Sequence, residues 1–339
     1  MKRLTQHALF WPVTTLVLLL IVSAIFNPAF LSIAWRDGHL YGNLVDILNR
    51  AAPLMVVSLG MTLVIAVRGL DISVGAVVAI AAVVAALLIG GNFSASGDAA
   101  SEHPLWLALG TALAVAAACG LWNGLLVVKA GMQPIVATLI LMVAGRGIAQ
   151  LLTGGQIITV YYPPFFTLGN GYWLGIPVAL WIAVALWGVL HLALARTALG
   201  LFIRAIGGNP EAARVAGIRA ASITLCVYTF CGLAAGVAGL IISSNVKSAD
   251  ANNAGQLLEL DAILAVTLGG TALTGGRFTL AGTVIGALII QTLTSMIYSL
   301  GVPPEVNLVV KAALVFAVML LQSPEFRSLV MRVVRSKPA

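Results

Sequence analysis

The stretch EAARVAG, residues 211–217, lies in the only long basic loop of a chain that is otherwise almost entirely apolar. Asn209 and Pro210 precede it, and these residue types favour the N-cap and the first position of a helix. An acidic residue in the first turn also suits the helix dipole. We therefore predict a helix of about two turns, with Ala212, Ala213 and Ala216 exposed and nothing bulky to hold another surface away.

Two interpretations of this segment are open. A short helix rich in alanine and glycine is a poor catalyst, but it fits a groove in another protein. The plain alternative is a surface helix that only links the long apolar segments on either side, 176–195 and 220–243. We favour docking, with the coupling residues Glu211, Ala212, Ala213, Arg214 and Gly217.

Composition places the rest of the chain in a membrane. The 339 residues are 60% hydrophobic and 9% charged, with a mean hydropathy of +1.06. A soluble domain carries about 25% charged residues, so this chain cannot cover an aqueous surface. The fold class we predict is an all-α integral membrane protein with one transmembrane domain over residues 1–339.

Ten segments have the roughly 20 mostly apolar residues that a spanning helix needs. The pair 258–274 and 278–300 is the least regular, because Gly269-Gly270 and Gly275-Gly276 are positioned to break it into a re-entrant element. The first segment is read as an uncleaved helix rather than a signal peptide. The predicted spans are 9–28, 44–67, 72–90, 105–128, 133–152, 176–195, 220–243, 258–274, 278–300 and 307–322.

Charge sets the predicted orientation. With both ends in the cytoplasm, thirteen of the lysines and arginines fall on inner segments and four on the outer side: Arg36, Arg50, Lys247 and Lys311. This bias is what the positive-inside rule expects. Segment 209–217 and the tail 323–339 are then cytoplasmic, and the net charge of +7 is an orientation signal rather than a nucleic-acid footprint.

No enzyme motif is present in the sequence. It lacks the G-x-x-x-x-G-K-[ST] loop that cradles ATP phosphates and the H-E-x-x-H zinc motif. The cysteines Cys119, Cys226 and Cys231 lie in apolar runs without metal-ligand spacing and are interpreted as buried small residues. We expect no catalytic residue, no metal and no cofactor on this chain.

Residues 69–75 join two spans with almost no loop. Glycine allows the sharp turn, and Asp71 can cap a helix that starts at Ile72. A capped tight turn is one interpretation. The other is that Asp71 and Ser73 lie on an interrupted segment that lines a translocation path, where irregular backbone at depth is tolerated.

Polar groups inside apolar spans are costly and therefore suggest function. Arg146 is the clearest, and an ion pair with Asp46, Glu259 or Asp261 is the preferred interpretation. Asn123, Gln133 and Thr138 either hold neighbouring helices together or touch a solute. The polar stretch 248–255, with Asn252 and Asn253, is either a solvated loop or a contact for the solute or its carrier. Together these residues are candidates for a translocation pathway: Asp71, Ser73, Asn123, Gln133, Thr138, Arg146, Asn252, Asn253 and Asp261.

Four motifs resemble one family across nearly the whole chain beyond the first helix. They are LDISVG at 70–75, QPIVATL at 133–139, the loop from Arg204 to Gly217, and LDAI at 260–263 with its following glycine pair. Their combination is similar to the permeases of bacterial ATP-binding-cassette importers for ribose, xylose, arabinose and galactose. Residues 48–53, 249–255 and 303–305 are most similar to galactofuranose permeases.

This resemblance implies a fold, a location and partners. The chain would lie in the bacterial inner membrane and pair with a second permease, identical or paralogous. Two copies or halves of a cytoplasmic ATPase would dock on 209–217 and use the ATP, while a periplasmic sugar-binding protein would deliver the sugar. The alternatives are a related permease for an amino acid or nucleoside and an ion-coupled transporter, which should carry more carboxylates at mid-span than this chain does.

Overall fold

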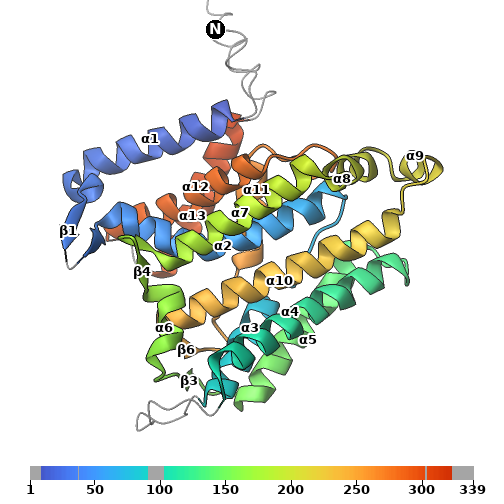
Figure 1. Ribbon diagram of the computed structural model, residues 1–339. Coiled ribbons are helices and arrows are strands. Elements are labelled where there is room, and N and C mark those ends of the chain that lie inside the picture. The colour runs from blue at the N-terminus through green and yellow to red at the C-terminus, as the bar shows by residue number, and fades with distance from the viewer. Residues whose placement is uncertain (1–8, 37, 91–102, 302–303, 323–339) are drawn as a thin grey trace, which may run out of the picture.

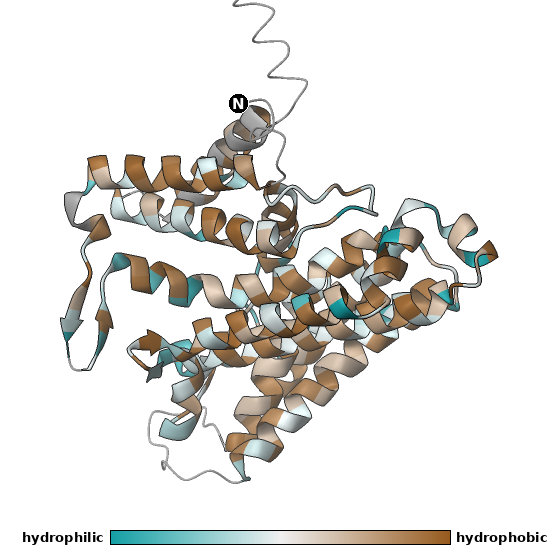
Figure 2. Ribbon diagram, turned by 45° about the horizontal axis from the view of Figure 1, so that its top comes forward, coloured by the Kyte–Doolittle hydropathy of each residue, from teal (hydrophilic) through white to brown (hydrophobic). Residues whose placement is uncertain are grey.

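The computed structural model describes residues 9–36, 38–90, 103–301 and 304–322. It is an array of helices, apolar along most of their lengths, with polar residues gathered toward turns and ends (Figures 1 and 2). The predicted tail 323–339 lies outside the described residues. The long helices are α1 Phe10–Phe26, α2 Asn43–Ala66, α3 Val74–Ile89, α4 Leu105–Val128, α5 Pro134–Thr153, α7 Val178–Arg196, α10 Ala220–Val246, α12 Leu280–Ser299 and α13 Pro304–Gln322.

Short elements connect these helices. Four are short helices: α6 Pro163–Asn170, α8 Leu199–Gly208, α9 Pro210–Val215 and α11 Leu258–Leu268, and η1 Pro28–Leu31 is a 3₁₀ turn. Three antiparallel pairs of strands are described: β1 Ala34–Arg36 with β2 His39–Tyr41, β3 Ile158–Thr159 with β6 Ser248–Ala249, and β4 Tyr172–Trp173 with β5 Ile176–Pro177.

Every predicted span coincides with a helix, but the helices are not equal. Within the described residues, six are long and apolar enough to cross a membrane: α2, α4, α5, α7, α10 and α12. The helix in the predicted span 258–274 ends at Leu268, so α11 is only 11 residues, or about 16 Å, long. This is about half of a bilayer core, which agrees with the glycine break we expected there. Ten crossings remain a prediction.

Two other boundaries differ from expectation. The uncharged loop 153–175 contains the helix α6, whose first two residues are prolines. Helix α3 begins at Val74 rather than Ile72, although Asp71 Oδ1 accepts from the N–H of Ser73 two residues on, which is the hydrogen bond that a cap at Asp71 would make. The N-cap, Ser73, makes no side-chain capping bond.

Small residues decide where helices touch. α4 and α10 cross at Gly120, Gly232 and Gly236, as expected where backbones approach closely in a membrane. A Cβ on Gly232 would lie 2.5 Å from the carbonyl oxygen of Ala116 and 2.8 Å from the Cα of Gly120. α2, α3 and α10 form the buried centre, and α4, α5 and α7 cover it with much of their surface outward.

The two ends of the bundle bring together different connections. At one end the N–H of Gly276 donates to the carbonyl of Ala66, and α8 lies against both. At the other end β3 pairs with β6, and the N–H of Gly169 donates to Ser244 Oγ at 2.7 Å. Segments that the charge pattern predicts on one side of the membrane therefore meet at one end of the bundle.

Gly232→Ala is expected to lower the stability of the protein by about 1–3 kcal/mol, because the added methyl overpacks the α4–α10 crossing. Thermal unfolding of the detergent-solubilised protein measures this. Gly188→Ala in α7 is the matched control, since its Cβ would meet nothing within 4 Å and alanine favours a helix. Equal losses for both variants would contradict the packing argument.

Candidate functional site

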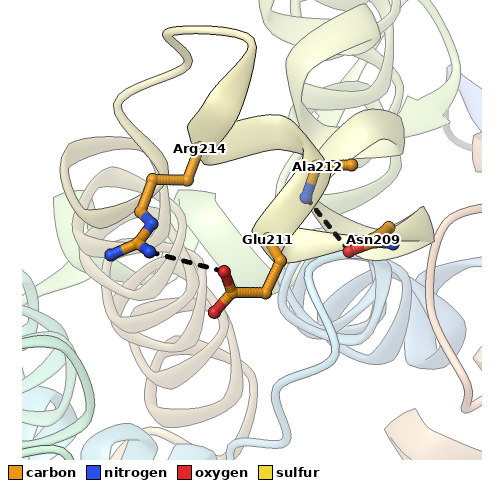
Figure 3. A network of polar contacts seen from close by, with 4 residues as sticks. All are labelled: Asn209, Glu211, Ala212 and Arg214. Atoms are coloured by element: carbon orange, nitrogen blue, oxygen red, sulfur yellow. Dashed lines mark hydrogen bonds and ion pairs between the residues drawn. The ribbon is translucent and has the colours of Figure 1, made fainter.

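The helix predicted at the basic loop is present, and it is α9. It projects from one end of the bundle beside α8 (Figure 1). Asn209 is its N-cap, with Oδ1 accepting from the N–H of Ala212 at 3.1 Å (Figure 3). Pro210 is its first residue, as predicted. Arg214 pairs with Glu211 at 3.4 Å, but both side chains are exposed, so this pair adds little stability.

The end of α9 is fixed by glycine geometry. The N–H of Ile218 donates to Ala213 and the N–H of Gly217 donates to Arg214, which is the bonding of a Schellman motif. Gly217 has φ +82° and open space around its Cα. It is therefore required by its backbone conformation rather than by close packing within the chain.

The exposed surface of α9 differs from the prediction. Ala213 is buried against its own chain, so it cannot be presented to a partner, whereas Ala212 and Ala216 are exposed. The most prominent apolar side chain is Val215, which is 85% exposed. The sequence interpretation overlooked Val215 because it concentrated on the small residues of the motif.

Arg68 ties α8 to the centre of the bundle. Its Nε donates to the carbonyl of Gly207 at 2.7 Å and its Nη2 to that of Gly208 at 2.5 Å. Arg68 has φ +64°, an uncommon conformation for a side-chain-bearing residue, so these contacts hold a strained turn at the end of α2. In the sequence, Arg68 is visible only as one of the thirteen basic residues of the inner segments.

Four of the candidate pathway residues come together at the break between α2 and α3. Ser73 donates from its N–H and its Oγ to Asp71 Oδ1, at 3.0 and 2.7 Å. Asn123 of α4 donates to the same oxygen at 3.3 Å and to Ser73 Oγ at 2.8 Å. Thr138 of α5 accepts from the N–H of Ile72 at 3.3 Å. This is the helix-to-helix bonding that one interpretation of Asn123 and Thr138 expected.

This polar core is closed in the described structure. Asp71, Ser73, Asn123 and Thr138 are each at most 1% exposed. Asn123 Oδ1 has no hydrogen-bond partner among the described residues. The arrangement fixes the position of the α2–α3 break, and any contact with a solute would require this core to open.

Arg146 makes a different contact from the expected ion pair. No carboxylate lies within ion-pair distance among the described residues. Its Nη1 instead donates to the carbonyls of Ala251 and Ala254, at 3.0 and 2.7 Å. Arg146 therefore holds the turn between α10 and α11 from α5, one turn below Gln150, which donates to Asn252 Oδ1 at 2.6 Å.

That turn is ordered by its own side chains. Asp250 accepts hydrogen bonds from the side chain of Asn253 and from the N–H groups of Asn252 and Asn253. Partial burial raises the pKa of Asp250, but these bonds outweigh it and hold the pKa below its usual value. The stretch is thus an ordered turn whose two asparagines are exposed.

The remaining two candidates lie apart from these groups. Asp261 forms an ion pair with Lys311 at 2.6 Å. Lys311 lies seven residues into α13, and its ion pair joins α13 to α11. Gln133 is exposed at the N-cap of α5, before Pro134.

Known proteins resemble this chain along nearly its whole length. The family model for the permease component of branched-chain amino acid transport systems matches residues 43–319. The galactofuranose transporter permease protein YtfT of Escherichia coli (strain K12) is 46% identical, over 94% of this chain and 92% of the relative. No solved structure matches the chain.

Two further relatives are named for other sugars. The fructose import permease protein FruF of Bifidobacterium longum (strain NCC 2705) is 37% identical, over 97% of this chain and 91% of the relative. The ribose import permease protein RbsC of Bacillus subtilis (strain 168) is 38% identical, over 91% of each chain. With a family match over most of the sequence, the chain belongs to the family of branched-chain amino acid transport system permease components.

Proposed function

We propose that this chain is the membrane permease subunit of an ATP-binding-cassette importer and that it carries a monosaccharide, with galactofuranose the first candidate, into the cytoplasm. The observation that carries the proposal is the near end-to-end match to sugar permeases, at 46% identity for the galactofuranose protein. The projecting helix α9 supports it, because the permease of an importer needs a surface on which a separate ATPase docks and through which it drives the conformational change.

A path for that work runs from α9 to the buried centre. α9 follows α8 directly, and α8 is held to the end of α2 by Arg68. Gly207 packs between Ala66 and Gly276 with no space for a side chain. Because packed contacts transmit displacement rather than absorb it, a shift of α9 would reach α2, the α2–α3 break and the turn before α12.

The proposed assembly follows from this role. Two permease subunits, identical or paralogous, form the pore, and two ATPase copies or halves bind at the α9 end. A periplasmic sugar-binding protein delivers the solute at the opposite end. In this arrangement the chain crosses a bacterial inner membrane ten times, its termini and α9 are cytoplasmic, and nucleotide is bound by the ATPase alone.

A permease for a branched-chain amino acid is the second candidate, favoured by the description of the matching family. The sugar is preferred because the relatives above are named for sugars. The pathway residues proposed for either solute are those at the α2–α3 break, Arg146, Gln133, the asparagines at 252–253 and Asp261.

ATP-driven uptake tests the function. Proteoliposomes that contain the permease, its ATPase and its binding protein should accumulate labelled galactose only when ATP is supplied on the side of the membrane that the ATPase faces. Galactose is a suitable probe because in solution it includes a furanose form. Uptake of leucine but not of sugar would select the second candidate. Uptake driven by a proton or sodium gradient without the ATPase would contradict both.

Val215→Asp should separate the ATPase from the permease. A charge in an apolar contact must be desolvated, so the amount of ATPase retained on the purified permease should fall at least tenfold, which corresponds to about 1.4 kcal/mol. Co-purification in mild detergent measures this. Leu174→Asp is the matched control, since Leu174 is 72% exposed in the β4–β5 turn at the opposite end. Loss of ATPase in the control, or full retention in Val215→Asp, would count against docking at α9.

Arg146→Ala should release the turn between α10 and α11. It removes two charge-assisted hydrogen bonds, each worth about 1.5–3 kcal/mol, and should lower both the thermal stability and the uptake rate. Arg146→Lys, which keeps one point charge, is expected to be intermediate. An Arg146→Ala protein with normal stability and normal uptake would show that the guanidinium is dispensable.

A further inference from the structure

A cavity of about 570 Å³ opens between α2 and α12. It lies near the start of α2 and the end of α12, so it is at the end of the bundle opposite α9 (Figure 1). We call it the outer vestibule. Its volume is within the range of small-molecule sites, about 300–1,000 Å³. None of its residues is among the pathway candidates above.

The lining consists of two polar stripes at helical spacing. On α2 the stripe consists of Asn43, Asp46 and Arg50, and Ile47 also lines the cavity. On α12 the stripe includes Gln291, Thr294, Ser295 and Tyr298. Residues three, four and seven apart share one face of a helix, so each helix turns a polar face toward the same space.

These stripes extend well into the helical layer. Gln291 is eight residues before the end of α12, which is about 12 Å along the helix. Arg50 is seven residues into α2, or about 10 Å. Polar and charged side chains at such depth are costly against lipid, and they face a water-filled space or a protein interior. The outer vestibule is therefore not a lipid-facing surface.

The polar groups of the vestibule are available to a ligand. Asp46 and Arg50 are four residues apart, yet they form no ion pair in the described part of the chain. Both side chains are exposed. The adjacent amide of Gln291 and the hydroxyl of Ser295 offer further donors and acceptors without fixed charge.

The chemistry of this lining selects the solute. One acid and one base give no net charge, so a neutral solute or a zwitterion is accepted in preference to a net anion or cation. Amides and hydroxyls predominate, and the apolar members are Phe30 and Ile47, both buried, and the ring of Tyr298, which is half-exposed. Polar and apolar surface line the cavity about equally, and a ring that carries several hydroxyls can use both the polar groups and the aromatic face.

We propose that the outer vestibule is a binding site for a neutral monosaccharide, occupied after the sugar reaches this end of the permease. Asp46, Arg50 and Gln291 hydrogen-bond its hydroxyls, and the Tyr298 ring packs on its C–H face. This inference rests on the proposed function, because it takes the transported solute to be a sugar. It adds the residues that touch the solute.

Water access is tested by cysteine labelling of the full transporter in proteoliposomes. In a Cys226→Ser background, which removes the exposed native cysteine, Ser295→Cys should react with a membrane-impermeant thiol reagent. Thr292→Cys, on the same helix but 1% exposed, is the matched control and should not react. If Ser295→Cys fails to assemble, Ser299→Cys replaces it. No labelling of either cavity position would overturn the proposal.

Sugar protection tests the ligand class. Galactose, fructose, ribose and arabinose are the probes, and leucine is the zwitterionic comparison. At least one sugar should slow labelling of Ser295→Cys severalfold, while leucine should have no effect. Where ATP-driven sugar uptake is normal but no sugar protects, the vestibule proposal is overturned and the proposed function stands. Where sugar uptake is absent in the unmodified transporter, the proposed function itself fails.

Substitution tests the contacts directly. Gln291→Leu keeps the size of the side chain but removes its amide, and it should raise the sugar concentration for half-maximal uptake about tenfold. ATPase binding to the permease should be unchanged, since Gln291 is remote from α9. Gln291→Glu, which keeps an acceptor, should lose less. An unchanged half-maximal concentration in Gln291→Leu would show that this amide does not touch the sugar.

Discussion

Hydrocarbon cannot bond to a peptide group, so every backbone N–H and C=O at membrane depth must find a partner within the protein. Long uninterrupted helices satisfy this requirement by themselves. The breaks at 67–73 and 269–279 do not, and they occur where other backbone and side-chain groups supply the missing bonds. The N–H of Gly276 donates to the carbonyl of Ala66, and the hydroxyl of Thr138 accepts from the N–H of Ile72. These breaks are possible because α2, α3 and α11 are enclosed by other helices.

The same constraint gives the bundle two kinds of polar group. Those of the closed polar core, Asp71, Ser73 and Asn123, bond to one another and are shielded from solvent. Those of the outer vestibule, Asp46, Arg50 and Gln291, face a cavity instead. In the importer that we propose, which alternates between two conformations, a vestibule at the end opposite α9 and a closed core toward α9 fit an outward-open arrangement. A ligand that binds such a state better than the alternative shifts the population toward it.

Contacts at the α9 end of the bundle connect the short helix α8 to the buried centre. Arg68 at a left-handed position joins the carbonyl end of α8 to the end of α2. Gly207 allows α8 to lie directly on Ala66 and Gly276. Strained residues held by surrounding contacts are common at switch regions, and this turn has that character. A partner that moves α9 therefore acts on the least regular part of the buried centre.

The sequence alone determined the membrane class, the position of each long helix and the cap of α9, because apolar length and the Asn-Pro-Glu start are local properties. It also indicated the family, through motifs that are read residue by residue. Tertiary structure alone decided which groups meet. Ala213 is buried and Val215 exposed because α9 packs on its own chain, Arg146 binds carbonyls of a turn 105 and 108 residues away, and Lys311 meets Asp261 because α13 lies beside α11. The polar stripes of α2 and α12 are visible in the sequence, but only the packing of the two helices makes them one cavity.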